Sequence, residues 1–179
     1  NRRALRRAAR RRVHAGTRST IVCIGDSITE YGSHVAVGGV PAGLIRPGSP
    51  AGSSEEHGPG WVALLARDYQ WSRRADVLNR GFGGYNTRHV LEDLPALLPE
   101  RTCCVAAVLM LGSNDHHRPS HPLHVPPAEF ERNMERLLLV LAAEVPNAVR
   151  IVLSPPPCDA ARWREHSLRS SRGLDDGGG

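Results

Sequence analysis

The sequence predicts an α/β fold built on a parallel sheet, because short apolar runs of strand length alternate with amphipathic helical segments. The connections between the runs are long enough for crossover helices, which parallel strands require. Three of the runs are followed directly by polar or glycine-rich loops. We expect the strands at residues 20–24, 76–79, 104–111 and 149–153.

Each helix expected between these strands has its own sequence signal. The apolar stripe of the first helix, over 61–70, comprises Trp61, Leu64, Leu65 and Tyr69. The second helix is expected over 87–98, with Thr87 as its cap and Pro99 as its stop. Pro126-Pro127 opens the third and most regular helix, which ends near Glu144. Its inward positions are expected to be Phe130, Met134, Leu137, Leu138 and Leu141.

We expect a single domain over residues 19–157, with a tail on either side. Residues 1–18 form an Arg-rich tail that is expected to be disordered, and residues 158–179 diverge from the pattern before them. Within the domain, residues 32–60 are rich in Gly, Pro and Ser. We expect an insertion loop there, disordered rather than folded as a lid.

The net charge of +5 comes from the N-terminal tail. The first 18 residues hold eight arginines and no acid, whereas the remainder holds 15 arginines against 18 acids, and the chain has no lysine. The domain therefore gives no reason to expect a nucleic-acid partner. For the tail, a disordered extension, an organelle transit peptide and a nucleic-acid-binding arm stay open.

Cysteine usage predicts a reducing compartment. Cys23, Cys103, Cys104 and Cys158 show no Cys-x-x-Cys spacing, so neither a disulfide framework nor a zinc site is expected. We expect an intracellular, cytoplasmic location, with an organelle as the alternative if the N-terminus is a transit peptide. The longest apolar run, 103–111, is too short to span a membrane.

The most informative segment runs from Gly25 to Thr29 and follows the first strand directly. Ser27 lies where a buried strand meets a loop, so its hydroxyl would face a ligand on the loop side. The segment is not the Gly-x-Ser-x-Gly elbow, because position 29 is Thr. Ser27 could instead serve only as a helix cap. Asp26 is expected to anchor the loop rather than to be catalytic.

Two further loops follow the second and third strands, and they carry Gly84 and Asn114. Loops at the carboxyl ends of neighbouring parallel strands converge on one crevice. The backbone N–H groups of Ser27 and Gly84 and the side-chain amide of Asn114 could therefore form an oxyanion hole around a Ser27 nucleophile. Gly84 could also be a turn glycine with positive φ, and Asn114 a turn residue. Asp115 is expected to tie neighbouring loops by hydrogen bonds.

These segments resemble the first three motif blocks of the SGNH (GDSL-type) hydrolases, over about residues 20–157. The phrases that carry the resemblance are Gly25 to Glu30, Asn79 to Arg88 and Leu111 to Asp115, with a further stretch from Val125 to Pro157. Within this family, the sequence of these segments is similar to that of the isoamyl acetate-hydrolysing esterase group. The resemblance implies a flavodoxin-like three-layer α/β/α fold, a small acetate-type ester as substrate, an acyl-enzyme on Ser27, and no metal or organic cofactor.

The family's catalytic base is a His in an Asp-x-x-His segment, and no Asp of this chain is followed three places later by His. We therefore expect a fold truncated at its C-terminus, with weak or absent activity. A pseudo-enzyme that keeps the ligand pocket, or an incomplete gene model, are the alternatives. His116 or His117 could replace the base, and His166 cannot be placed. A metal site in the His-rich loop (His116, His117, His121 and His124) is disfavoured by spacing. The oligomeric state is not indicated.

Overall fold

The computed structural model describes residues 18–33 and 59–157. The chain divides into two compact units, and residues 18–33 and 59–155 belong to the first of them. The tails and most of the 32–60 loop lie outside the described residues, as do Cys158 and His166. The expectations about their order therefore stay predictions.

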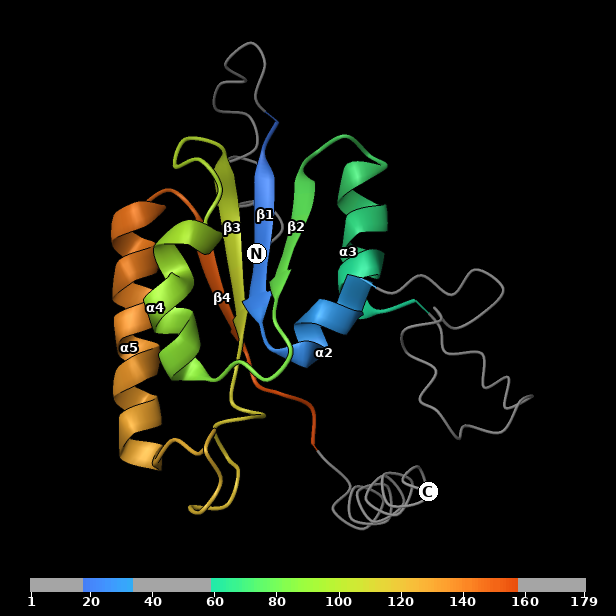
Figure 1. Ribbon diagram of the computed structural model, residues 1–179. Helices are drawn as coiled ribbons and strands as arrows, with labels where there is room; N and C mark the ends of the chain where they lie inside the picture. The colour runs from blue at the N-terminus through green and yellow to red at the C-terminus, as the bar shows by residue number, and fades with distance from the viewer. Residues whose placement is uncertain (1–17, 34–58, 158–179) are drawn as a thin grey trace, which may run out of the picture. The chain divides into compact units, whose positions relative to one another are not determined.

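Four parallel strands form one sheet in the order β2-β1-β3-β4. Their bounds are Thr20–Gly25 (β1), Asp76–Gly81 (β2), Cys104–Met110 (β3) and Val149–Leu153 (β4). The predicted strands are confirmed, with β1 and β2 running one and two residues further than expected. All four strands point the same way, so their carboxyl ends lie at one edge of the sheet (Figure 1).

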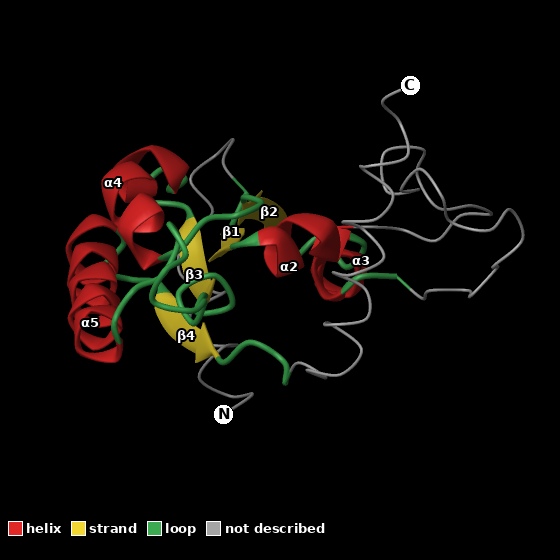
Figure 2. Ribbon diagram, turned by 60° about the horizontal axis from the view of Figure 1, so that its bottom comes forward, coloured by secondary structure: helices red, strands yellow, loops and turns green. Residues whose placement is uncertain are grey.

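Helices cover the two faces of the sheet, which makes three layers. Helices α4 (Thr87–Leu97) and α5 (Pro127–Glu144) lie on one face, and α3 (Trp61–Gln70) lies on the other (Figure 2). A short helix, α2 (Ser27–Glu30), follows β1 directly and runs into a 3₁₀ turn, η1 (Tyr31–Ser33). The sequence analysis missed α2, because four residues are too few to show helical periodicity.

The core has two parts, one on each face of the sheet. The larger part joins the sheet to α4 and α5 through residues such as Val22, Leu94, Leu109 and Leu137. The smaller part joins it to α3 through Val62. Such burial stabilises the fold by about 1.5–3 kcal/mol for each fully buried large apolar side chain.

Two details of the predicted helices are wrong. Leu64 was expected on the inward stripe of α3 but is exposed, and Val62 takes the buried position. Thr87 was expected to cap α4, but the cap is Asn86, and Thr87 is the first helical residue. The buried face of α3 is therefore rotated relative to the predicted stripe, and α4 begins one residue earlier than predicted. Such offsets are usual at helix boundaries.

Two of the cysteines considered in the sequence analysis lie in the interior of the sheet. Cys23 and Cys104 are buried, and burial raises the pKa of Cys23 to about 12 and that of Cys104 to about 11. Both thiols are therefore uncharged at neutral pH, as buried structural cysteines are.

Among the described residues, no helix combines the length and apolar character needed to cross a membrane.

Candidate functional site

Ser27 lies at the carboxyl end of β1, as the first residue of α2. Asp26 is the cap of this helix: its Oδ1 accepts a hydrogen bond from the backbone N–H of Ile28 at 2.9 Å, and its side chain is fully buried. The cap therefore precedes Ser27, so the reading of Ser27 as a mere cap is wrong and the anchoring role expected for Asp26 is confirmed. Ser27 is half-buried.

Helix α2 is held against the end of β2 by Asn79. The Nδ2 of Asn79 donates to the backbone oxygens of Thr29 at 2.7 Å and Glu30 at 3.1 Å, and its Oδ1 accepts from Gly81 N–H at 2.8 Å. A Cβ at Gly81 would lie 2.1 Å from the backbone nitrogen of Glu30. Only glycine allows this approach, so β2 sets the position of the helix that carries Ser27.

The loop after β2 is joined to the loops on both sides of it. Phe82 N–H donates to Gly25 O at 3.0 Å, which links it to the segment that leads to Ser27. Asn114 Nδ2 donates to Tyr85 O at 2.8 Å, which links it to the loop after β3. The structure therefore brings the three predicted strand-end loops together.

Gly84 lies in this middle loop with a φ of 79°. A Cβ at this position would meet nothing within 4 Å, so the backbone conformation, and not crowding, requires glycine. The space beside Gly84 is open to a ligand. The amide of Asn114 uses one of its two N–H bonds on Tyr85 and keeps the second for another acceptor.

A buried polar cluster fixes the loop that follows Asn114. Oδ1 of the buried Asp115 accepts from Thr87 N–H at 3.0 Å and from Thr87 Oγ1 at 2.5 Å. Asn133 on α5 donates to the same Thr87 hydroxyl at 3.0 Å. The role expected for Asp115, tying neighbouring loops together, is confirmed.

Sequence reasoning assigned no role to Asn79, Asn86 or Asn133. Asn79 belongs to one of the motif segments, but its side-chain contacts depend on how closely α2 approaches β2. Asn133 did leave a signal, because it lies four and eight residues before Leu137 and Leu141 on the buried face of α5. A polar residue in an otherwise apolar stripe indicates a buried partner.

In the His-rich loop after Asp115, the imidazoles of His116, His117 and His121 stack on one another. The rings of His117 and His121 stack with centroids 4.0 Å apart, and those of His116 and His117 lie 5.9 Å apart. His116 Nδ1 lies 3.2 Å from Gly112 O, and His124 Nδ1 lies 2.6 Å from His117 O. No histidine in the described part of the chain hydrogen-bonds to Ser27, so a substitute base is not identified.

Metal and cofactor binding were not expected at this site. Within residues 18–33 and 59–157, no three His, Cys, Asp or Glu side chains are grouped so that they could hold a metal ion. The donors that the site does contain are backbone and side-chain N–H groups beside a serine hydroxyl. Such a set can stabilise the negative charge that develops on a carbonyl oxygen under attack.

The Asp115 cluster should contribute measurably to stability. Asp115→Ala leaves the buried N–H and hydroxyl of Thr87 without an acceptor, so we expect the free energy of unfolding to fall by about 1–3 kcal/mol. Asp68→Ala, which removes an exposed carboxylate, is the matched control and should change it by less than about 0.5 kcal/mol. Urea unfolding measures both, and equal losses would contradict the assignment.

The ring of His117 should titrate below the ordinary range of histidine. Burial, then the charges of His121 and His116, lowers the pKa of His117 from its usual 6.5. Between the lowered value and 6.5 the unfolded chain binds more protons, so stability falls as the pH drops through this window. We expect an NMR midpoint for the His117 ring below 6.5, and a higher midpoint in His121→Gln. A midpoint at or above 6.5 in the unmodified chain would refute the stacked arrangement.

Comparison with known proteins shows which family this chain is similar to. The model of the GDSL-like lipase/acylhydrolase family matches residues 23–174. A GDSL esterase/lipase of Arabidopsis thaliana is 37% identical over 107 residues, which are 57% of this chain and 43% of that protein. The isoamyl acetate-hydrolyzing esterase 1 homologs of Bos taurus and Mus musculus are 37% and 38% identical, over 62% and 61% of this chain. The matched stretch spans less than half of each relative: 46% and 45% of the two mammalian proteins.

Solved structures show the same fold. A protein from Parabacteroides merdae described as a GDSL-like lipase matches with a TM-score of 0.51 and 20% identity, over 76% of this chain and 59% of its own. A variant of an acetyl xylan esterase from Geobacillus stearothermophilus matches with a TM-score of 0.50 and 22% identity, over 75% of this chain and 60% of its own. At these identities the likeness concerns the three-layer architecture alone. With the family model matching most of its length, the chain belongs to the GDSL-like lipase/acylhydrolase family.

Proposed function

We propose that Ser27 is the nucleophile of an ester hydrolase and that Ser27, Gly84 and Asn114 supply its oxyanion hole. The observation that carries the proposal is the hydrogen bond from Asn114 Nδ2 to Tyr85 O, because it fixes the amide beside the loop that holds Gly84. The Phe82–Gly25 bond fixes that same loop beside the start of α2. The three proposed donors are thus held by one continuous set of contacts.

The substrate class proposed is a small carboxylic ester of the acetate type. The mammalian relatives are named for hydrolysis of isoamyl acetate, and this is the basis for the choice. In the first step Ser27 Oγ would attack the carbonyl carbon, lose its proton to a base and expel the alcohol. Water would then attack the acyl-serine and release the acid and the free serine.

The base is the part of the mechanism that the chain does not supply in the family's usual form. The sequence has no Asp-x-x-His, and no described histidine hydrogen-bonds to Ser27: His116 and His124 contact backbone oxygens, and the His117 ring stacks on its neighbours. Loss of a triad member still leaves about 10³–10⁴-fold catalysis over water from the oxyanion hole and binding. We therefore propose slow turnover for these 179 residues. A binding protein without turnover is the alternative, and the missing base is what favours it.

Labelling with a fluorophosphonate tests the nucleophile. We expect slow labelling of the unmodified chain and none of Ser27→Ala, because the probe reports an activated hydroxyl. Ser113→Ala is the matched control, since it removes a serine from the neighbouring strand-end loop, and it should label normally. Circular dichroism of each variant establishes that it is folded.

The oxyanion donors are tested by the rate of the same reaction. Removing one donor from such a site lowers the rate by about 10²–10³, so Asn114→Ala should label correspondingly more slowly than the unmodified chain. Labelling that persists in Ser27→Ala would contradict the proposal. A folded chain that binds acetate esters but never labels would favour the binding protein.

A further inference from the structure

Trp71 lies in the turn after α3, and 90% of its side chain is exposed to solvent. No other large apolar side chain in the described part of the chain is as exposed, and the next is Leu139 on α5 at 69%. A single exposed apolar residue is common and by itself needs no explanation. The turn that carries this indole, however, has two further features.

The first feature is that hydrogen bonds close the turn. Arg73 N–H donates to Gln70 O at 2.9 Å, and Arg74 N–H donates to Tyr69 O at 3.0 Å. The hydroxyl of Ser72 donates to Asp68 O at 2.6 Å. These bonds satisfy the last carbonyl groups of α3 and hold the backbone on both sides of Trp71.

The backbone of the turn also adopts an uncommon conformation. Arg73 has a φ of 53°, and it is the one non-glycine residue with positive φ among those described. Such a conformation is unfavourable for a residue with a side chain. The fold therefore maintains, at some cost, a turn that directs an indole into solvent.

The second feature is positive charge around the indole. Residues 67–74 contain three arginines and one acid. Arg67 and Asp68 approach to 3.3 Å, but both side chains are about two-thirds exposed, so this pair is weak. Arg73 and Arg74 form no ion pair with any other described residue. The turn therefore carries a local excess of cations, although the rest of the domain is acidic.

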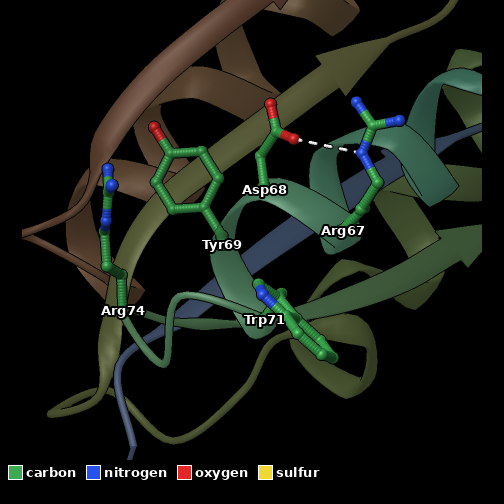
Figure 3. A pocket seen from close by; sticks show the side chains of 5 residues that line it. All are labelled: Arg67, Asp68, Tyr69, Trp71 and Arg74. Carbon is green, nitrogen blue, oxygen red and sulfur yellow. Dashed lines mark hydrogen bonds and ion pairs between the residues drawn. The ribbon is translucent and has the colours of Figure 1, made fainter.

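The indole and the cations share one surface. Figure 3 shows Trp71 and the guanidinium groups of Arg67 and Arg74 projecting from the end of α3 and the turn after it. Together with Asp68 and Tyr69 they line an open hollow of about 780 Å³. Trp and Tyr gather at membrane–water interfaces, and Arg side chains are attracted to anionic lipid headgroups.

We propose that the turn around Trp71 binds the surface of an anionic lipid bilayer, with the indole inserted among the headgroups and Arg67 and Arg74 facing the lipid phosphates and carboxylates. An enclosed small-molecule site would bury most of its ligand, whereas this indole stands free. Nucleic acid is disfavoured because outside the first 18 residues the chain has 15 arginines against 18 acids, without the broad basic surface that such binding requires.

The position of the turn separates this surface from the candidate active site. The turn leads into the amino end of β2, whereas Ser27, Gly84 and Asn114 follow the carboxyl ends of the strands (Figure 1). A chain bound to a bilayer through Trp71 would therefore keep its candidate active site toward water. The membrane would determine where the protein resides, without delivering the ester.

Vesicle sedimentation of the full 179-residue chain tests the proposal. We expect binding to vesicles of equal parts phosphatidylcholine and phosphatidylserine, and little binding to phosphatidylcholine alone. Trp71→Ala should weaken binding to the anionic vesicles by about tenfold. Leu139→Ala, which removes another exposed apolar side chain from a different face, is the matched control and should bind as the unmodified chain does. Lipids brominated near the headgroup should quench tryptophan fluorescence in the control and not in Trp71→Ala.

Every variant retains the Arg-rich residues 1–18, so a difference in vesicle binding between two variants comes from the substitution itself. If Trp71→Ala binds anionic vesicles as strongly as the unmodified chain, other basic residues bind the lipid and the proposal is wrong. Absence of binding to anionic vesicles would also overturn it. Trp71-dependent binding of a single-stranded oligonucleotide in place of vesicles would assign the surface to nucleic acid instead. Equal circular dichroism spectra of Trp71→Ala and the unmodified chain confirm that the variant is folded.

Discussion

Gly25 pairs with Gly81 of β2 on one side and with Met110 of β3 on the other, so three parallel strands end at the same level of the sheet. The loops that leave these strands begin within one row of paired residues. Glycine at Gly25 and Gly81 lets α2 pack against the strand ends, because a Cβ at either position would come within 2.1 Å of an atom of α2. A shift of β1 by one residue would separate Ser27 from both neighbouring loops.

Hydrogen bonds between loops then convert this common level into a defined set of donors. Asn79 secures α2 to β2, and Asn114 secures the third loop to the second. Asp115, through Thr87, secures that same loop to the beginning of α4. Each of these side chains is buried or half-buried, where an unpaired polar group is unfavourable, so the contacts favour a single loop arrangement. This prearrangement is what oxyanion stabilisation requires.

The fold and the site differ in how far the sequence predicts them. In the described part of the chain, apolar runs and helical stripes predicted every strand and the three long helices, because burial on a sheet or helix face imposes a period on the sequence. The contacts of Asn79 and Asn133 were not predictable in this way, since they depend on the approach of elements distant in the chain. The predictions for Leu64 and Thr87 were wrong for a related reason, because packing decides how a helix is rotated and at which residue it begins. Ser27, Gly84 and Asn114 were found from motifs, and their joint action remains a proposal.

The most direct measurement of that proposal is a crystal structure of the chain soaked with a small alkyl boronic acid, which forms a reversible tetrahedral adduct with a nucleophilic serine. We expect boron bonded to Ser27 Oγ, with one boronate oxygen about 2.7–3.1 Å from the backbone nitrogens of Ser27 and Gly84 and from Asn114 Nδ2. An adduct whose oxygens point away from these donors, or boron bonded elsewhere while Ser27 stays free, would contradict it.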